Sequence, residues 1–246
     1  MEIVLLTALG VGMSTIFGGV LGFIFQKTSQ KFNDLILSFA SGVMLCASIL
    51  GLILPSIELG GDFSALITAL GIVCGAIIIN LCDRLVPQIS NLIGKPSSDE
   101  KYNRVLLFVM AIAIHNLPEG IATGVAFGTG DTSQALTVAI GIALQNLPEG
   151  MVIISPLLAC GFSKKKTFFI AVFTGFTEIL GTILGYFAIS ISSYILPFAL
   201  ALAGGTMIYV ICDEMIPESH INGSSRGVSY SLLLGFCLML IFDWLI

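Results

Sequence analysis

The chain alternates between long apolar runs and short polar connections. Eight apolar runs can be placed, at residues 2–25, 33–54, 63–82, 104–127, 135–160, 166–190, 195–217 and 228–246. Each is close to the roughly 20 residues that an α-helix needs to cross the hydrocarbon core of a bilayer. The pattern predicts an all-α polytopic membrane protein with eight transmembrane helices in one domain over residues 1–246.

The composition agrees with this pattern. Hydrophobic residues make up 56% of the chain, charged residues 10%, and the mean hydropathy is +1.03. Soluble domains have roughly 45–50% apolar and about 25% charged residues. The first run begins Met1-Glu2 without a basic segment, so it is expected to be the first span rather than a cleavable signal peptide.

The basic residues predict the orientation, because they all fall in alternate connections. These residues are Lys27, Lys31, Arg84, Lys95, Lys101, Arg104, Lys164, Lys165, Lys166 and Arg226. The positive-inside rule places such connections in the cytoplasm, so both termini are expected on the extracytoplasmic side of the plasma or inner membrane. The longest connection, about 83–103, is expected to be a flexible linker.

A polar hexapeptide occurs twice inside apolar sequence. It reads His-Asn-Leu-Pro-Glu-Gly at 115–120 and Gln-Asn-Leu-Pro-Glu-Gly at 145–150. Residues four apart share a helix face, so His115 is expected above Glu119 with Asn116 beside them. The second copy repeats the arrangement with Gln145, Asn146 and Glu149. Two helices are thus expected to present one site at mid-membrane depth.

Two further residues are candidates for the same site. Glu178 lies among small residues in the run 166–190, and Met44 lies in the run 33–54. Met44 has two interpretations that the sequence leaves open, a core gap-filler or a thioether ligand for a soft metal ion. Pro118 and Pro148 each remove a backbone hydrogen bond, which is expected to free carbonyl oxygens near the site.

The three mid-membrane carboxylates have no protein cation beside them. Lys and Arg occur only in the connections and at the cytoplasmic ends of the runs. An unpaired ionised carboxylate is not stable in hydrocarbon, so these groups are either protonated or bind a mobile cation. Imidazole, amide and carboxylate groups together favour a divalent metal ion. The alternative is that neutral acids tie helices together by hydrogen bonds.

A second polar cluster lies toward the cytoplasmic end of the seventh run. It consists of Asp213, Glu214, Glu218 and His220. Two interpretations carry equal weight, ordinary solvated polarity at a helix end and an exit or relay site for metal ions.

The two hexapeptides, with segments 39–58, 174–185 and 204–220, resemble the ZIP (Zrt/Irt-like protein) metal transporters, in particular their GufA-like branch. The resemblance implies inverted repeats, spans 1–3 and 6–8, around spans 4–5. It also implies a mid-membrane site with two adjacent metal positions and alternating access. The residues that match the family's metal positions are Met44, His115, Asn116, Glu119, Gln145, Asn146, Glu149 and Glu178.

The chain departs from the family pattern in two places. The connection between spans three and four has no histidine-rich segment, which argues against metal sensing there. Gln145 and Asn146 stand where many members have His or Asp, so the site has less negative charge and one imidazole. We therefore expect zinc to bind more weakly and less selectively than in those members. The first metal ion is expected to bind at His115, and the second position is expected to be filled weakly or not at all.

These observations predict an importer of divalent transition metal ions, Zn²⁺ first, with Cd²⁺, Fe²⁺, Mn²⁺ and Co²⁺ as further substrates. No organic cofactor, nucleic acid or enzymatic activity is expected, and no ATP-binding motif is present. Membrane lipid and metal ions are the expected partners, and a homodimer is one option for the assembly. Two alternatives stay open, an intramembrane metal-dependent hydrolase and a carrier in which the glutamates cycle protons.

Overall fold

The computed structural model describes residues 1–25, 29–84, 100–191, 195–221 and 226–245. The side chains of Asp83, residues 100–109, Ala111, Ser190 and Ile191 are outside this description. Within the described ranges all regular structure is helical. The all-α prediction is therefore confirmed for this part of the chain.

The long helices follow the predicted apolar runs. They are α1 (Glu2–Ile24), α2 (Gln30–Ser48), α4 (Ser64–Asp83), α6 (Glu100–Ala126), α7 (Thr132–Val152), α9 (Lys164–Ile191), α10 (Leu196–Val210) and α12 (Arg226–Leu245). Shorter pieces are η1 (Ile49–Ile53), α3 (Leu54–Leu59), η2 (Gly61–Phe63), η3 (Phe127–Thr129), α8 (Ile154–Ala159), η5 (Ile211–Met215) and α11 (Ile216–His220). Most of the linker expected over 83–103 lies outside the described residues, but 100–103 belong to α6.

Seven helical segments of the described chain are long and apolar enough to cross a membrane. They are Glu2–Ile24, Gln30–Leu59, Gly61–Cys82, Thr132–Ala159, Lys164–Ile189, Leu196–His220 and Arg226–Leu245. These segments are those of a polytopic membrane protein. Helix α6, which carries the first hexapeptide, has 27 residues, but the side chains of its first turns are not described.

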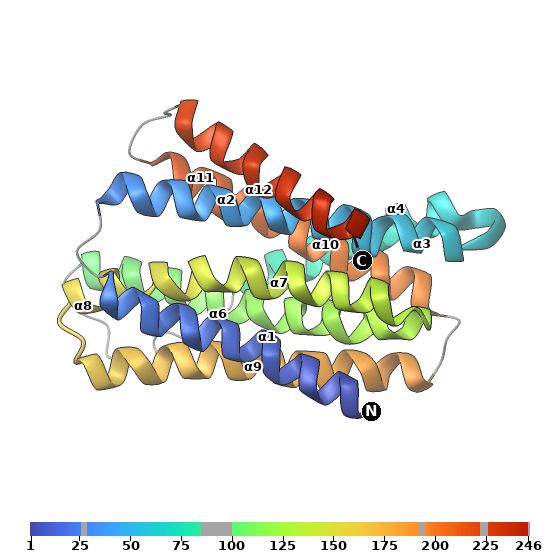
Figure 1. The fold of residues 1–246 in the computed structure, drawn as a ribbon, viewed down its shortest axis with the longest axis horizontal. Coiled ribbons are helices and arrows are strands. Elements are labelled where there is room, and N and C mark those ends of the chain that lie inside the picture. Colours follow the sequence, from blue (N-terminus) through green and yellow to red (C-terminus); the bar gives the residue numbers. More distant parts are fainter. Residues whose placement is uncertain (26–28, 85–99, 192–194, 222–225, 246) are drawn as a thin grey trace.

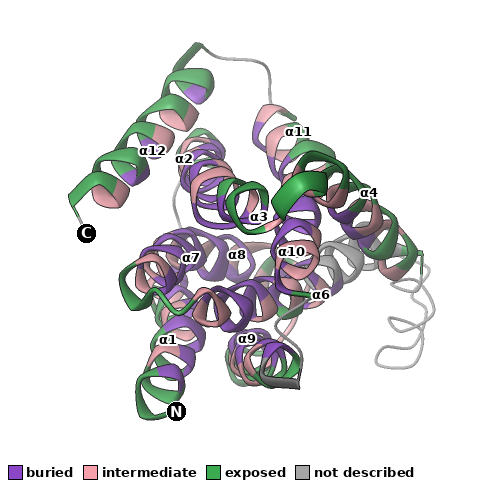
Figure 2. Ribbon diagram, turned by 90° about the vertical axis from the view of Figure 1, so that its right-hand side faces the viewer, coloured by how far each residue is buried: buried purple, intermediate pink, exposed green. Residues whose placement is uncertain are grey.

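The helices form two layers (Figure 1). The layer that we call the motif layer consists of α1, α6, α7 and α9, in which α6 packs on α9 and α1 packs on both α7 and α9. The opposite layer consists of α2, α4, α10 and α12, in which α2 packs on α12 and α10 on α4. Contacts of α2 with α7 and of α10 with α6 join the two layers. Figure 2 shows that buried residues concentrate on α2, α7 and α10, whereas α12 is largely exposed.

Two π-helical turns extend the second and seventh spans. Helix α2 continues through η1 into α3, and α10 continues through η5 into α11. Each π-turn precedes a proline, Pro55 in α3 and Pro217 in α11. Proline lacks an N–H and its ring clashes with the carbonyl four residues earlier, so the helix widens before it. By contrast, α6 and α7 run through Pro118 and Pro148 as α-helices.

Glycines allow the helices of each layer to approach backbone to backbone. A Cβ atom added at Gly12 would lie 2.4 Å from the carbonyl oxygen of Gly175, and the converse distance is also 2.4 Å. A Cβ atom at Gly235 would lie 2.1 Å from the carbonyl oxygen of Phe39. Small residues at such positions are the usual means of tight helix packing in membranes.

We expect Gly235→Ala to destabilise the protein by about 1–3 kcal/mol, because its methyl group would push α12 away from α2. Thermal unfolding of the detergent-solubilised protein measures the effect. Gly10→Ala is the matched control, since a Cβ atom there meets nothing within 4 Å. Equal unfolding temperatures for the two variants would contradict the close α2–α12 packing.

Candidate metal site

The structure buries all eight residues that the sequence predicted for the metal site. None exceeds 5% exposure, the value for Glu149. Helices α6 and α7 pack together and carry the two hexapeptides, while α9 supplies Glu178 and α2 supplies Met44. The two motifs and Glu178 therefore meet inside the motif layer.

Glu178 is held by donors from three other helices. Its Oε1 atom accepts hydrogen bonds from Thr15 Oγ1 and from Asn116 Nδ2, both at 2.6 Å. Its Oε2 atom accepts from Asn146 Nδ2 at 2.7 Å. Hydrogen bonds to a carboxylate are among the stronger ones in proteins, so this cluster ties α1, α6 and α7 to α9.

A second set of hydrogen bonds joins the two hexapeptides directly. The Gln145 Nε2 atom donates to Glu119 Oε2 at 2.6 Å and to Asn146 Oδ1 at 2.9 Å. The amide of Asn146 thus receives one hydrogen bond and donates another toward Glu178. These contacts bring the two repeated motifs together; that they form one metal site stays a prediction.

Three oxygen atoms at this junction have no hydrogen-bond donor among the described residues. They are Asn116 Oδ1, Glu119 Oε1 and Gln145 Oε1. Buried polar atoms in native proteins are nearly always paired, so three unpaired acceptors in one place require an explanation. Amide and carboxylate oxygens without donors are suited to bind a cation.

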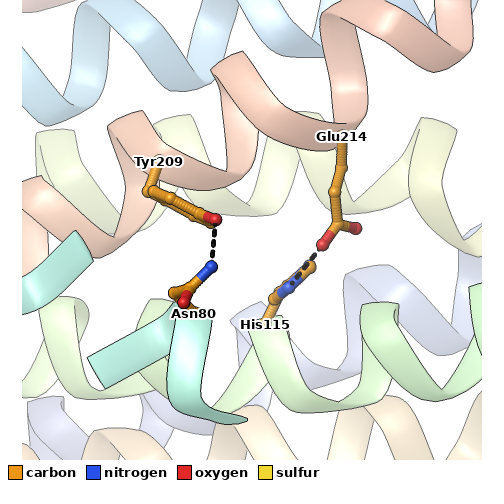
Figure 3. Close-up of polar contacts among 4 residues, drawn as sticks. All are labelled: Asn80, His115, Tyr209 and Glu214. Atoms are coloured by element: carbon orange, nitrogen blue, oxygen red, sulfur yellow. Dashed lines mark hydrogen bonds and ion pairs between the residues drawn. The ribbon is translucent and has the colours of Figure 1, made fainter. Parts of the chain in front are cut away.

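His115 reaches across to the opposite layer. Its Nε2 atom lies 3.1 Å from Glu214 Oε1, which comes from η5 (Figure 3). A cavity of about 20 Å³ lies beside this pair, and its lining includes Glu149 and Glu218. That volume is enough for about one water molecule or ion.

The remaining predicted residues make other contacts. Met44 is 1% exposed and packs in an apolar cluster that includes Leu52 and Met207. Asp213 is exposed. The His220 ring bonds the carbonyl oxygen of Ile216, at 2.8 Å, in its own helix. The cluster at 213–220 is thus divided, with Glu214 and Glu218 at the cavity.

Within the described part of the chain, no three His, Cys, Asp or Glu side chains are grouped closely enough to hold a metal ion by themselves. The amide oxygens of Asn116 and Gln145, which have no donor among the described residues, are the further oxygen atoms available at this junction. A metal ion held by His115, Glu119 and Glu149 requires these side chains to move together.

Sequence reasoning missed two contacts of the site. Thr15 has the pattern of a small packing residue, yet its hydroxyl group bonds Glu178. Glu214 belongs to the predicted exit cluster, but its carboxylate contacts His115 itself. The π-turn η5 that carries Glu214 has no simple sequence signal, apart from Pro217 after it.

Comparison with known proteins places this arrangement in a family. The family model described as ZIP Zinc transporter matches residues 90–243. The chain belongs to the ZIP zinc transporter family. It is 37% identical to "Zinc transporter GufA" of Myxococcus xanthus, over 97% of both chains.

Other relatives are named in the same way. "Zinc transporter ZIPB" of Bordetella bronchiseptica is 35% identical, over 94% of this chain and 77% of the relative. Human "Zinc transporter ZIP11" is 30% identical, over 93% of both chains. The resemblance to the GufA-like branch is therefore confirmed, and the relatives are transporters by name rather than enzymes.

We expect Gln145→Leu to lower the stability of the folded protein by about 1 kcal/mol, because Glu119 loses its donor while buried. Thermal unfolding of the metal-free protein provides the measurement. Gln134→Leu on the same helix is the control, since Gln134 lies in the first turn of α7, away from the site. A smaller loss for Gln145→Leu than for Gln134→Leu would contradict the contact.

Proposed function

We propose that the chain carries divalent transition metal ions across a membrane toward the cytoplasm, with Zn²⁺ as the preferred substrate. The observation that carries this proposal is the set of buried, unpaired oxygens of Asn116, Glu119 and Gln145. Three buried carboxylates lie in the same layer, and the sequence places no Lys or Arg at that depth. A mobile cation would satisfy these oxygen atoms and balance the charge.

The proposed ligands come from the eight residues predicted from the sequence. His115, Glu119 and Glu149 form the principal position, with Met44 and Gln145 as further donors. Asn116, Asn146 and Glu178 belong to the adjacent second position of the family pattern. Nitrogen and oxygen donors of this kind suit Zn²⁺, and also allow Fe²⁺, Mn²⁺, Co²⁺ and Cd²⁺.

We infer eight spans in one transmembrane domain, the seven apolar segments given above and, in addition, α6. Its 27 residues correspond to about 40 Å of helix, which is enough to cross the bilayer. Both termini lie at the same end of the molecule (Figure 1), as an even number of spans requires. The basic residues Lys164–Lys166 and Arg226 lie at the opposite end, which we assign to the cytoplasm.

The helix packing supports inverted repeats. A Cβ atom added at Gly120 would lie 2.2 Å from the carbonyl oxygen of Glu178. One added at Gly150 would lie 2.2 Å from the carbonyl oxygen of Thr15. Replacing Gly120 by Gly150 and Glu178 by Thr15 turns the first contact into the second. Helix α1 therefore corresponds to α9, and α6 corresponds to α7.

The opposite layer repeats the relation. A Cβ atom added at Gly42 in α2 would meet the carbonyl oxygen of Leu232 in α12. One added at Gly205 in α10 would meet the carbonyl oxygen of Ile72 in α4. Helix α2 thus corresponds to α10 and α12 to α4. The π-turns η1 and η5 are counterparts as well, each followed by a proline.

The cavity beside His115 suggests the side from which the ion leaves. It is lined by Glu214 and Glu218, which lie toward the end assigned to the cytoplasm. At the opposite side of the site, Leu52, Ile142 and Leu200 are fully buried in the apolar core. The structure therefore fits a state closed to the outside, and transport requires that this apolar seal opens.

Alternating access follows from the division into layers. Most of the proposed ligands belong to the motif layer, whereas Glu214 belongs to the opposite layer. A displacement of one layer against the other would break the contact between His115 and Glu214 and would expose the site to the other side. No ATP-binding motif is present, so transport is passive or coupled to another gradient.

The surface is suited to lipid. Helices α4 and α12 expose large apolar side chains, among them Leu70, Ile77, Leu234 and Ile241. Such a surface is expected where helices face hydrocarbon. Membrane lipid is therefore a proposed partner, and the homodimer stays a prediction.

We expect Glu119→Ala and Glu149→Ala each to abolish zinc uptake into proteoliposomes, because each removes an ionisable ligand from the buried site. Uptake is measured with radioactive zinc at several concentrations. Glu58→Ala is the matched control, since that carboxylate is exposed at the end of α3, and its uptake should equal that of the unmodified protein. Full uptake by Glu119→Ala would overturn the site assignment.

A further inference from the structure

Glu178 differs from the buried carboxylate Glu119 in how completely it is paired. It accepts three hydrogen bonds, from Thr15, Asn116 and Asn146, all between 2.6 and 2.7 Å. In contrast, Glu119 has one oxygen atom bonded to Gln145 and one without a donor among the described residues. Protein donors therefore satisfy both oxygen atoms of Glu178, which needs no metal ion as a partner.

We propose that Glu178 is a hydrogen-bonded anchor rather than a ligand of a second metal ion, that Thr15 is a positioning residue for it, and that the chain carries one ion at a time. This inference rests on the proposed function and replaces the second metal position of the family pattern. The single ion then lies among His115, Glu119 and Glu149 with the unpaired amide oxygens.

The two asparagine amides beside Glu178 are oriented as hydrogen-bond donors and not as metal ligands. Both present their Nδ2 groups to Glu178, and an amide NH₂ group donates hydrogen bonds but does not bind metal ions. The Asn146 Oδ1 atom already accepts from Gln145, at 2.9 Å. A second ion beside Glu178 would have to displace these donors from the carboxylate.

In the proposed inverted repeat, Thr15 occupies the position that corresponds to Glu178. Thr15 and Glu178, whose side chains bond each other, are 163 residues apart. The same separation relates Gly12 to Gly175, two glycines that face each other across the contact between α1 and α9. Thr15 is thus the counterpart of Glu178 in the first repeat. Two carboxylates at this pair of positions would require a cation between them, whereas a hydroxyl group donates a hydrogen bond instead.

The anchor also explains how the unpaired oxygens are kept in place. Glu178 holds the Nδ2 atoms of Asn116 and Asn146 from both of its oxygen atoms, and the Asn146 amide in turn holds Gln145. With their nitrogen atoms fixed, Asn116 and Gln145 leave Oδ1 and Oε1 unpaired. The network therefore preorganises oxygen donors for one ion before it arrives.

The direct test is the zinc content of the purified full-length protein at saturation, measured by equilibrium dialysis and elemental analysis. We expect one zinc ion per chain in the unmodified protein and none in Glu119→Ala. Two ions per chain, falling to one in Glu178→Gln, would overturn the anchor and leave the proposed function intact. No bound zinc in the unmodified protein would overturn the proposed function, and the anchor with it.

A second variant tests the donors themselves. Asn146→Asp replaces a donor beside Glu178 by an acceptor, so two carboxylates then face each other without a shared proton donor. We expect the zinc content of this variant to rise from one ion to two. A content of one ion in Asn146→Asp would contradict the claim that protein donors exclude the second ion.

Thr15→Val tests the positioning residue, because valine keeps the volume and removes the hydroxyl group. We expect a roughly tenfold higher KM for zinc uptake with the maximal rate retained, and near-normal KM in Thr15→Ser. Thr182→Val is the control, since this buried hydroxyl donates to the backbone carbonyl oxygen of Glu178, at 3.0 Å, and not to its carboxylate. An unchanged KM in Thr15→Val, or equal effects of Val and Ser, would contradict the role.

Discussion

The structure depends on one electrostatic constraint, which is that carboxylates buried between membrane helices must be stabilised without a protein cation. Glu119, Glu149 and Glu178 are at most 5% exposed, and Lys and Arg occur only in the connections and near helix ends. Burial of such groups costs several kcal/mol each unless they are paired. Hydrogen-bond donors meet this need at Glu178, and the proposed metal ion meets it at the other two.

In the inverted repeat that we propose, the chemistry of the site arises where the two repeats differ. The packing pairs relate α6 to α7, so His115 has Gln145 as its counterpart. Glu178 has Thr15, and Glu214 in η5 has Leu52 in η1. In each pair, one member supplies an ionisable group and the other a neutral one. The ionisable groups His115 and Glu214 meet beside the cavity, whereas Leu52 belongs to the apolar core.

The sequence predicted the fold well where apolar length alone decides it. The apolar runs matched the observed helices closely, because a membrane helix must satisfy its backbone within about 20 apolar residues. The doubled hexapeptide identified the buried polar residues of α6 and α7. Its prolines, Pro118 and Pro148, do not interrupt α6 and α7. The π-turns precede two other prolines, Pro55 and Pro217.

What the sequence could not give are contacts between distant helices. The hydrogen bond from Thr15 to Glu178 joins the first and sixth predicted spans, and threonine in a glycine-rich helix is more often a packing residue. The contact of Glu214 with His115 depends on a π-turn that rotates the end of the seventh span. Both depend on the relative placement of helices, on which local patterns carry no information.

The central claim is that a mobile divalent metal ion takes the place of the missing protein cation. The most direct test is uptake into proteoliposomes across a panel of Zn²⁺, Cd²⁺, Fe²⁺, Mn²⁺ and Co²⁺, with and without a proton gradient. The claim predicts saturable zinc uptake that a chelator abolishes and that does not need ATP. Proton or solute transport that continues in the presence of chelator, without metal uptake, would contradict it.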